Sequence, residues 1–266
     1  MNDHSFMVLA YKDSLYLSEC LESLKNQTSR SDIYICTSTP STYISEIAKK
    51  YGVGIFVTEY GKGVVHDNNF GLQQAKTKFV TMAHQDDLYL PEYAETCVAA
   101  ATKFKDTLIC FTNYSEIMDG NQRPVTFMLK VKRSILSAFM PFKSHLSTTF
   151  WKTRLLSLGN PIAAPTIMYN LENLSGFQMP EDLAHNVNTI DWQIWCNMAK
   201  MEGRFFYARK VLLKRRIHSD SLSSAGLENN SRYIEDLNMF RQFWPGFLAN
   251  ILAKVYASAY KSNSEK

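Results

Sequence analysis

The first 112 residues alternate short apolar runs with amphipathic segments, and no other feature constrains the fold as strongly. The apolar runs, each expected to form a strand, are residues 6–11, 33–36, 54–57, 79–83 and 108–112. The segments between them, each expected to form a helix, are residues 15–24, 43–51, 64–75 and 91–104. Strands that alternate with helices form βαβ units. The sequence therefore predicts an α/β fold with a mostly parallel central sheet.

Beyond this region the rhythm changes. Residues 113–188 are less regular and contain five prolines, at positions 124, 141, 161, 165 and 180. We expect this stretch to form the wall of a second pocket. A helix is predicted over residues 189–201 and a strand over 205–217, where apolar residues recur at helical and strand spacing, respectively.

The chain has 266 residues and is 45% hydrophobic, enough for a sizeable core without metal or disulfide staples. Its five cysteines are odd in number and form no CxxC pair, which favours buried free thiols in a reducing compartment. The amino terminus lacks a signal-peptide pattern, and no apolar run reaches membrane-spanning length. We therefore expect a cytoplasmic protein.

The net charge of +4 is small, and the basic residues are scattered apart from clusters at 130–133 and 214–216. No finger motif or set of stacking aromatics accompanies these clusters, so nucleic acid is not an expected partner. Anionic small molecules or a membrane surface fit the composition better.

The sequence HQDD, residues 84–87, directly follows the apolar run 79–83. Acids at the carboxyl end of a buried strand lie where parallel sheets bind ligands. Adjacent carboxylates repel, and a cation between them relieves the repulsion, so Mg²⁺ or Mn²⁺ with phosphate oxygens is the expected occupant. For Asp87, capping of the next helix is an equal alternative.

The other predicted strand ends also lead into polar or glycine-bearing loops, at residues 10–13, 37–40 and 59–63, over which a nucleotide could lie. No GxGxxG follows the first strand, and the chain contains no GxxxxGK[ST]. Neither a dinucleotide-binding fold nor a P-loop is therefore supported.

Asp191 opens the segment DWQIW, and His218 closes the run KRRI. Asp191 is either a functional acid or a first-turn acid favoured by the helix dipole. Trp192 and Trp195 are either sugar-stacking residues or core residues. A histidine at a strand end is ordinarily a surface residue.

Taken together, these segments resemble the family 2 glycosyltransferases with the GT-A fold. The resemblance runs from FMVLAYKDSLYLSECLESLKNQT through HDNNFGLQQAKTKFVTMAHQDD and DWQIW to RRIHSDSLS. It implies a Rossmann-like sheet flanked by helices, an irregular acceptor-side region and C-terminal helices. The implied parts are a nucleotide-sugar-binding half (1–112), an acceptor-side and catalytic half (113–225) and a C-terminal helical extension (226–266).

The resemblance also implies roles for individual residues. HQDD corresponds to the DXD-type motif, in which a divalent cation binds the donor diphosphate, with Asp86, Asp87 and His218 as implied metal ligands. The implied donor-binding residues are Tyr11, Thr37, Asp67, His84, Asp86, Arg216 and His218. Asp191 corresponds to the catalytic base that deprotonates the acceptor hydroxyl. Residues 219–224 resemble the flexible closing loop of the family.

Two positions depart from the family pattern. His84 stands where the first aspartate of the motif is usual, which reduces the negative charge offered to a metal. Thr37 stands where an aspartate commonly recognises the base or the ribose of the nucleotide.

The implied activity is an inverting transfer of a sugar from a nucleotide diphosphate donor, expected to be UDP-linked. The acceptor would be a glycan or a lipid-linked glycan of a bacterial-type surface polysaccharide. Two alternatives stay open: a metal-dependent hydrolase that uses His84, Asp86 and His218, and a non-catalytic nucleotide- or glycan-binding protein. The apolar face of residues 244–259 either packs on the domain or rests on a membrane at the inner face of the cell.

Overall fold

The structure is a computed structural model that describes residues 3–185, 188–218 and 231–264. The proposed closing loop, residues 219–224, lies outside the described residues. The strands are β1 (His4–Ala10), β2 (Asp32–Thr37), β3 (Gly54–Val57), β4 (Phe79–His84), β5 (Leu88–Tyr89), β6 (Thr107–Met118), β7 (Asn121–Gln122), β8 (His145–Leu146), β9 (Ile167–Asn170) and β10 (Arg204–Arg216).

The α-helices are α1 (Leu17–Lys25), α2 (Thr42–Tyr51), α3 (Val64–Gln73), α4 (Tyr93–Thr102), α5 (Phe127–Phe139), α6 (Thr149–Leu156), α7 (Ile190–Ala199), α9 (Ser231–Arg241) and α10 (Gly246–Ser264). The short 3₁₀ helices are η1 (Ala164–Thr166) and η2 (Glu181–His185).

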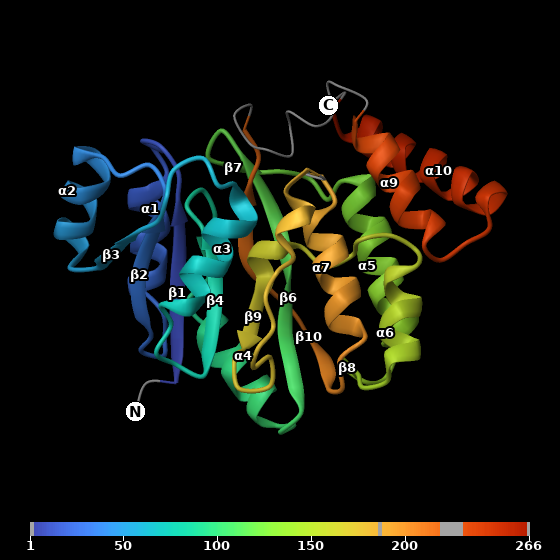
Figure 1. The fold of residues 1–266 in the computed structure, drawn as a ribbon, viewed down its shortest axis with the longest axis horizontal. Coiled ribbons are helices and arrows are strands. Elements are labelled where there is room, and N and C mark those ends of the chain that lie inside the picture. Colours follow the sequence, from blue (N-terminus) through green and yellow to red (C-terminus); the bar gives the residue numbers. More distant parts are fainter. Residues whose placement is uncertain (1–2, 186–187, 219–230, 265–266) are drawn as a thin grey trace.

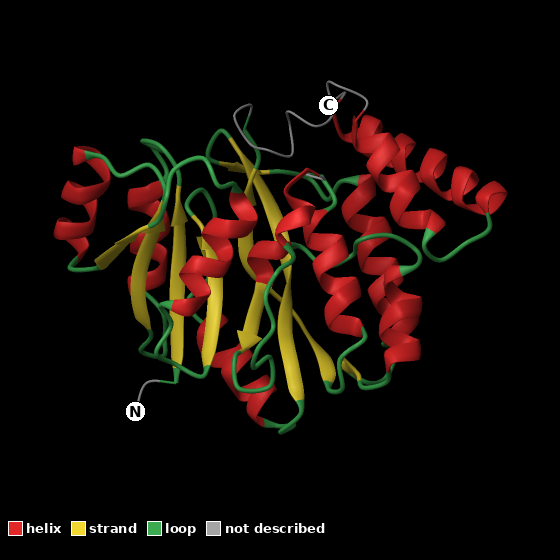
Figure 2. Ribbon diagram, viewed as in Figure 1, coloured by secondary structure: helices red, strands yellow, loops and turns green. Residues whose placement is uncertain are grey.

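Within the described residues, the strands form one ten-stranded sheet that runs through the middle of the molecule (Figure 2). Its main path is β3-β2-β1-β4-β9-β6-β10-β5, while β7 pairs with β6 and β8 pairs with β10. The β1, β2, β3 and β4 pairings and the long β6–β10 pairing are parallel. Strand β9 is antiparallel to both β4 and β6, so β4 and β6 point the same way. The carboxyl ends of β1, β2, β4, β6 and β10 therefore share one edge.

Helices cover both faces of this sheet and bury a hydrophobic core on each (Figure 1). Strand β1 serves both cores because its side chains alternate: Phe6 and Val8 join one core and Met7 joins the other. One core is completed by α1, α2 and α4. The other is completed by α3 and α7 and extends to α6, α9 and α10.

The sequence-based prediction of an α/β fold with a central multi-strand sheet is confirmed. The predicted strand at 54–57 has the observed bounds, and the first strand and helix differ by a few residues at each end. The stretch 113–188, predicted to be less regular, instead contains the continuation of β6 together with β7, α5, β8, α6 and β9.

The C-terminal helices α9 and α10 pack beside α5 at one end of the molecule (Figure 1). Tyr256 of α10 is buried, and its ring would lie 2.7 Å from a Cβ at Gly159, where the backbone φ is +133°. The Tyr256 hydroxyl accepts a hydrogen bond from the Asn160 amide at 3.0 Å. This tyrosine therefore joins the last helix to the loop that follows α6.

Only part of the predicted apolar face packs on the domain: Ala259 is buried, and Trp244 and Leu252 pack against the core. The buried residues of α10 are Ala249, Ala253, Tyr256 and Ala259. Phe247, Ile251 and Val255, placed by sequence on a packed or membrane-facing stripe, are exposed by 66, 56 and 60%. Among the described residues, no helix combines the length and apolar character needed to cross a membrane.

Candidate functional site

The turn that follows β4 carries the acidic cluster to the shared carboxyl edge of the sheet. The backbone amide of Asp87 bonds to the carbonyl of His84 at 3.2 Å, which closes the turn. The Gln85 side chain points back to β1, where its amide donates to the Tyr11 carbonyl and its oxygen accepts from the Tyr11 amide, both at 3.0 Å. This clasp fixes the turn against the end of β1 and leaves the Tyr11 ring half exposed, at 49%.

The turn places one imidazole and two carboxylates close together. Ligand atoms of His84, Asp86 and Asp87 all lie within 4.8 Å of one another. His218, which follows β10, contacts Asp86 through Nε2 and Oδ2 at 2.9 Å. Carboxylate oxygens with an imidazole nitrogen form a donor set that suits a divalent cation such as Mn²⁺. The chain therefore brings the predicted metal-binding residues to one place.

The carboxylate of Asp87 also has a structural role. Asp87 is buried, and its Oδ1 accepts a hydrogen bond from the Arg216 backbone amide at 2.8 Å. Burial and the neighbouring Asp86 raise the pKa of Asp87. Burial lowers the pKa of His84, which favours the neutral ring that a metal requires. A cation at this site would offset the cost of keeping both acids ionised.

The Arg216 side chain is held by protein groups. Its Nε donates to the Asp86 carbonyl at 2.9 Å, and a terminal nitrogen contacts Glu19 Oε2 at 2.6 Å. Its guanidinium lies 4.2 Å from the centre of the Tyr16 ring. Arg216 thus joins the end of β10 to both the acidic turn and α1, and places positive charge next to Asp86 and Asp87.

A second polar cluster lies where β2 ends and α3 begins. Thr37 is buried, and its hydroxyl accepts a hydrogen bond from the Thr39 amide at 3.0 Å. The Ser38 hydroxyl donates to Asp67 Oδ2 at 2.8 Å. Within the described part of the chain, the other oxygen of Asp67 is buried without a hydrogen-bond partner, and burial raises the pKa of this carboxyl. A ligand N–H or hydroxyl would satisfy that oxygen.

Asp191 lies in the first turn of α7 and is partly buried. Its Oδ1 accepts from the Trp192 amide at 2.8 Å. The charge of Asp191 is one of those that raise the pKa of His84 against the effect of burial, which relates this acid to the acidic turn. Asp191 is therefore a candidate proton acceptor beside the metal-binding residues.

The tryptophans of the same helix belong to the core. Trp192 and Trp195 are each 1% exposed, and Trp192 Nε1 donates to the Leu156 carbonyl at 3.0 Å. Of the two interpretations given to these rings by sequence, packing rather than sugar stacking is confirmed.

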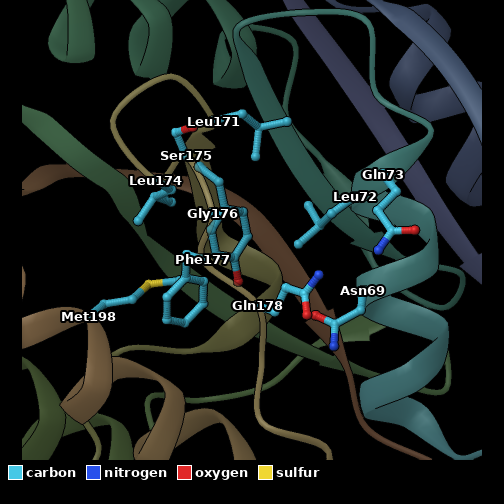
Figure 3. Close-up of a pocket in the computed structure, with 11 residues that line it drawn as sticks. Asn69, Leu72, Gln73, Leu171, Leu174, Ser175, Gly176, Phe177, Gln178 and Met198 are labelled. Atoms are coloured by element: carbon cyan, nitrogen blue, oxygen red, sulfur yellow. The ribbon is translucent and has the colours of Figure 1, made fainter.

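A cavity of about 320 Å³ lies away from this edge, between α3, α7 and residues 171–178 (Figure 3). Asn69, Leu72 and Gln73 of α3 line one side, and Phe177 and Met198 line the other. The lining includes neither Asp86 nor Asp191. The acidic cluster on the sheet edge, not this cavity, is therefore the candidate site.

Sequence reasoning missed two supports of the site, Gln85 and Glu19. Gln85 is hydrogen-bonded to Tyr11, which lies 74 residues away in sequence, and Glu19 contacts Arg216, which lies 197 residues away. No local pattern marks either residue as a partner.

The chain is similar in sequence and fold to known glycosyltransferases. Residues 5–161 match the family model of Glycosyl transferase family 2. A putative glycosyltransferase of Bacillus subtilis, EpsH, is 30% identical over 118 residues, which are 42% of this chain and 33% of that protein. An uncharacterized glycosyltransferase of Rickettsia prowazekii, RP339, is 24% identical over 251 residues, 93% of this chain and 72% of that protein. The chain thus spans only part of these relatives.

Solved structures share the fold. Staphylococcus aureus TarS (residues 1–349) in complex with UDP-GlcNAc superimposes with a TM-score of 0.63 at 16% identity, covering 98% of this chain and 73% of that one. The mannosyltransferase PcManGT of Pyrobaculum calidifontis in complex with GDP-Man and Mn²⁺ gives 0.62 at 13% identity, covering 99% and 74%.

Proposed function

Because the chain belongs to glycosyl transferase family 2 and has the GT-A fold, we propose that it transfers a sugar from a nucleotide diphosphate donor to an acceptor hydroxyl. The observation that carries this proposal is the cluster of His84, Asp86 and Asp87 at the carboxyl edge of the parallel strands, with Asp191 within electrostatic reach. The nucleotide-sugar complexes of the two solved relatives support a donor of this kind.

In the proposed reaction, His84, Asp86 and Asp87 hold Mn²⁺ or Mg²⁺, with His218 as a further ligand or a contact to the diphosphate. A cation bound there stabilises negative charge on the departing diphosphate. Asp191 takes the proton from the acceptor hydroxyl as that oxygen attacks the anomeric carbon, and attack opposite the leaving group inverts the configuration. The Mn²⁺ in the PcManGT complex supports this choice of metal.

The donor nucleotide is proposed to lie over Tyr11, Thr37 and Asp67. The buried Asp67 oxygen that has no hydrogen-bond partner among the described residues supports this placement, because a ribose hydroxyl or a base N–H would satisfy it. Arg216 contributes positive charge beside the acidic turn. UDP is the proposed nucleotide, and the UDP-GlcNAc complex of TarS supports this choice. The division at residues 112 and 225 into donor, acceptor and C-terminal parts belongs to the same proposal.

We further propose a glycan or lipid-linked glycan acceptor in polysaccharide biosynthesis, reached by peripheral contact with the inner face of the cell membrane. The exposed residues Phe247, Ile251 and Val255 recur along one side of α10, beside the exposed Lys254. Apolar side chains with a neighbouring lysine suit the interface of an anionic bilayer.

Binding is tested first. Thermal stabilisation is measured with UDP, GDP, dTDP and CMP, each with and without Mn²⁺, because a ligand of the folded state raises the melting temperature. We expect UDP to stabilise the wild type in the presence of Mn²⁺ and to lose this effect in Asp86→Ala. Failure of every nucleotide to stabilise the protein would favour a non-catalytic scaffold that binds glycan.

Catalysis is tested by the release of nucleoside diphosphate. We expect Asp191→Asn to keep donor binding and to lose turnover by about two orders of magnitude or more. Unchanged turnover in this variant would remove Asp191 from the mechanism. Rapid donor cleavage that needs Zn²⁺ but no acceptor would instead identify the metal-dependent hydrolase.

A further inference from the structure

The residues just before Asp191 are held by a side chain from the C-terminal helix pair. The Glu235 carboxylate, on α9, accepts a hydrogen bond from the Asn188 backbone amide at 2.9 Å and another from the Asn188 side-chain amide at 2.7 Å. A third bond comes from the Thr189 hydroxyl at 3.3 Å. One carboxylate thus fixes the two described residues that precede α7.

In the described contacts, only one side chain of α7 itself binds a backbone amide at its amino end. Thr189, at the N-cap position, makes no side-chain cap hydrogen bond. The Asp191 side chain bonds to the next amide, that of Trp192. The first amides of a helix carry partial positive charge, so a carboxylate close to them is favourable. Glu235, 46 and 47 residues away in sequence, brings a carboxylate to the N-cap residue Thr189 and to Asn188 before it.

The first turn of α9 is itself anchored. Asp236 is 1% exposed, and its Oδ2 lies 3.8 Å from Arg232 Nε, one turn earlier on the helix. The Arg232 guanidinium stacks 3.8 Å from the centre of the Tyr260 ring of α10. These contacts hold the amino-terminal part of α9, which carries Glu235, against α10.

From this geometry we propose that Glu235 is a positioning residue for the reaction. It holds residues 188 and 189 so that the Asp191 carboxylate stays aimed at the acceptor hydroxyl, and the C-terminal helices thereby become part of the catalytic unit. The inference rests on the proposed function of Asp191 as the base. A base displaced by a fraction of its hydrogen-bond length loses rate while donor binding is unaffected.

The test compares Glu235→Ala, Glu235→Gln and a matched control, Gln242→Ala. Gln242 also joins the C-terminal segment to α7, through a 2.7 Å bond to the Gln193 side chain, but at a point beyond the first turn. UDP release from UDP-N-acetylglucosamine is measured with water as the acceptor, and hydrogen exchange is followed in the peptide that contains residues 188–193. Asp191→Asn is included in the same assay.

We expect Glu235→Ala to lower kcat by about tenfold to a hundredfold with an unchanged donor KM, and to speed exchange at the start of α7. Glu235→Gln keeps the length but turns one acceptor into a donor, so its kcat should lie between wild type and alanine. Gln242→Ala should keep the wild-type kcat. Equal kcat in wild type and Glu235→Ala, or equal exchange at residues 188–193, would overturn the inference.

The two proposals fail in different ways. If Asp191→Asn turns over normally, the proposed function of Asp191 fails. In that case, or if the wild type releases no UDP with water as the acceptor, the exchange measurement alone decides whether Glu235 fixes the start of α7. If Asp191→Asn is inactive while Glu235→Ala is normal, the proposed function stands and the role of Glu235 is rejected.

Discussion

A neutral histidine buried at the amino end of β1 should make the stability of this protein depend on pH. His4 is 2% exposed, and its ring nitrogens contact the hydroxyls of Ser31 at 2.8 Å and Thr81 at 2.9 Å. Burial lowers the pKa of His4 to about 3. No acid pairs with this ring in the described contacts, so a proton added to it would be buried without a counter-charge.

The sign and the size of the effect follow from this pKa. The unfolded chain takes up a proton on His4 below about pH 6.5, whereas the folded protein does not until about pH 3. The stabilisation is therefore fully present above pH ~6.5 and is lost as the pH falls toward 3. Within that window the loss approaches about 1.4 kcal/mol per pH unit, which amounts to about 2 kcal/mol between pH 7 and pH 5.

Urea unfolding at these two pH values measures the effect, with His4→Gln as the variant that removes the titrating group. We expect the free energy of unfolding of the wild type to fall by about 2 kcal/mol more than that of His4→Gln. Ser31→Ala is the control, because it removes one hydrogen bond but keeps the buried ring. The free energy of unfolding of Ser31→Ala should be about 1 kcal/mol lower than that of the wild type at both pH values, and its pH dependence should be that of the wild type. An identical pH dependence in wild type and His4→Gln would refute the reasoning.

Three further predictions concern packing, donor recognition and membrane contact. Gly159→Ala should lower the free energy of unfolding, measured in urea, by about 2 kcal/mol or more, because the backbone φ is +133° and the new Cβ would lie 2.7 Å from the Tyr256 ring. Gly246→Ala, which has open space around it, should change the free energy of unfolding by less than about 0.5 kcal/mol. Equal losses in the two variants would contradict the packing argument. Asp67→Asn should keep the melting temperature within a few degrees and weaken UDP binding about tenfold or more by calorimetry, and wild-type affinity would exclude a donor contact. Replacing both Phe247 and Ile251 by serine should reduce co-sedimentation with anionic phospholipid vesicles. The control Ile234→Ser, at an exposed position of α9, should bind the vesicles as the wild type does. Equal binding by the wild type, the double variant and the control would reject α10 as the contact.

The sheet and helices of the first 112 residues could be predicted because each strand there is an uninterrupted apolar run followed by a clear helical pattern. Strand β9 could not be recognised, since its four residues follow Pro161 and Pro165 and carry no alternation. Its place between β4 and β6 depends on pairings between residues that lie 87 to 91 positions apart for β4 and 56 to 60 positions apart for β6, and no local signal encodes them. Helices α5 and α6 were missed for another reason: the prolines of this stretch were read as breaking regular structure, but they lie outside both helices, and Thr126 and Thr148 cap them locally.

The sequence predicted those residues of the candidate site that lie at or just after the ends of strands. His84, Asp86 and His218 could be grouped because parallel strands bring their carboxyl ends to one edge. Their individual contacts could not be predicted, because the same type of side chain can either bind a metal or make a structural hydrogen bond. Asp87 was assigned equally to a metal and to the cap of the next helix. The cap is wrong, because residues 88 and 89 form β5 and α4 begins at Tyr93 with Glu92 as its N-cap. The bond of Asp87 to the Arg216 amide is a role that only the folded chain reveals.

The Tyr256 contact with Gly159 and Asn160 has a consequence for how the protein is made. A ribosome synthesises the whole sheet before it adds α10, so the loop after α6 must wait for nearly a hundred more residues before its partner exists. Until then the Asn160 amide has only water to bond, and the space beside Gly159 stays open. The last helix therefore completes the core shared with α6, α7 and α9 late in synthesis. A chain that ended before residue 256 would have its amino-terminal strands formed while that core was incomplete.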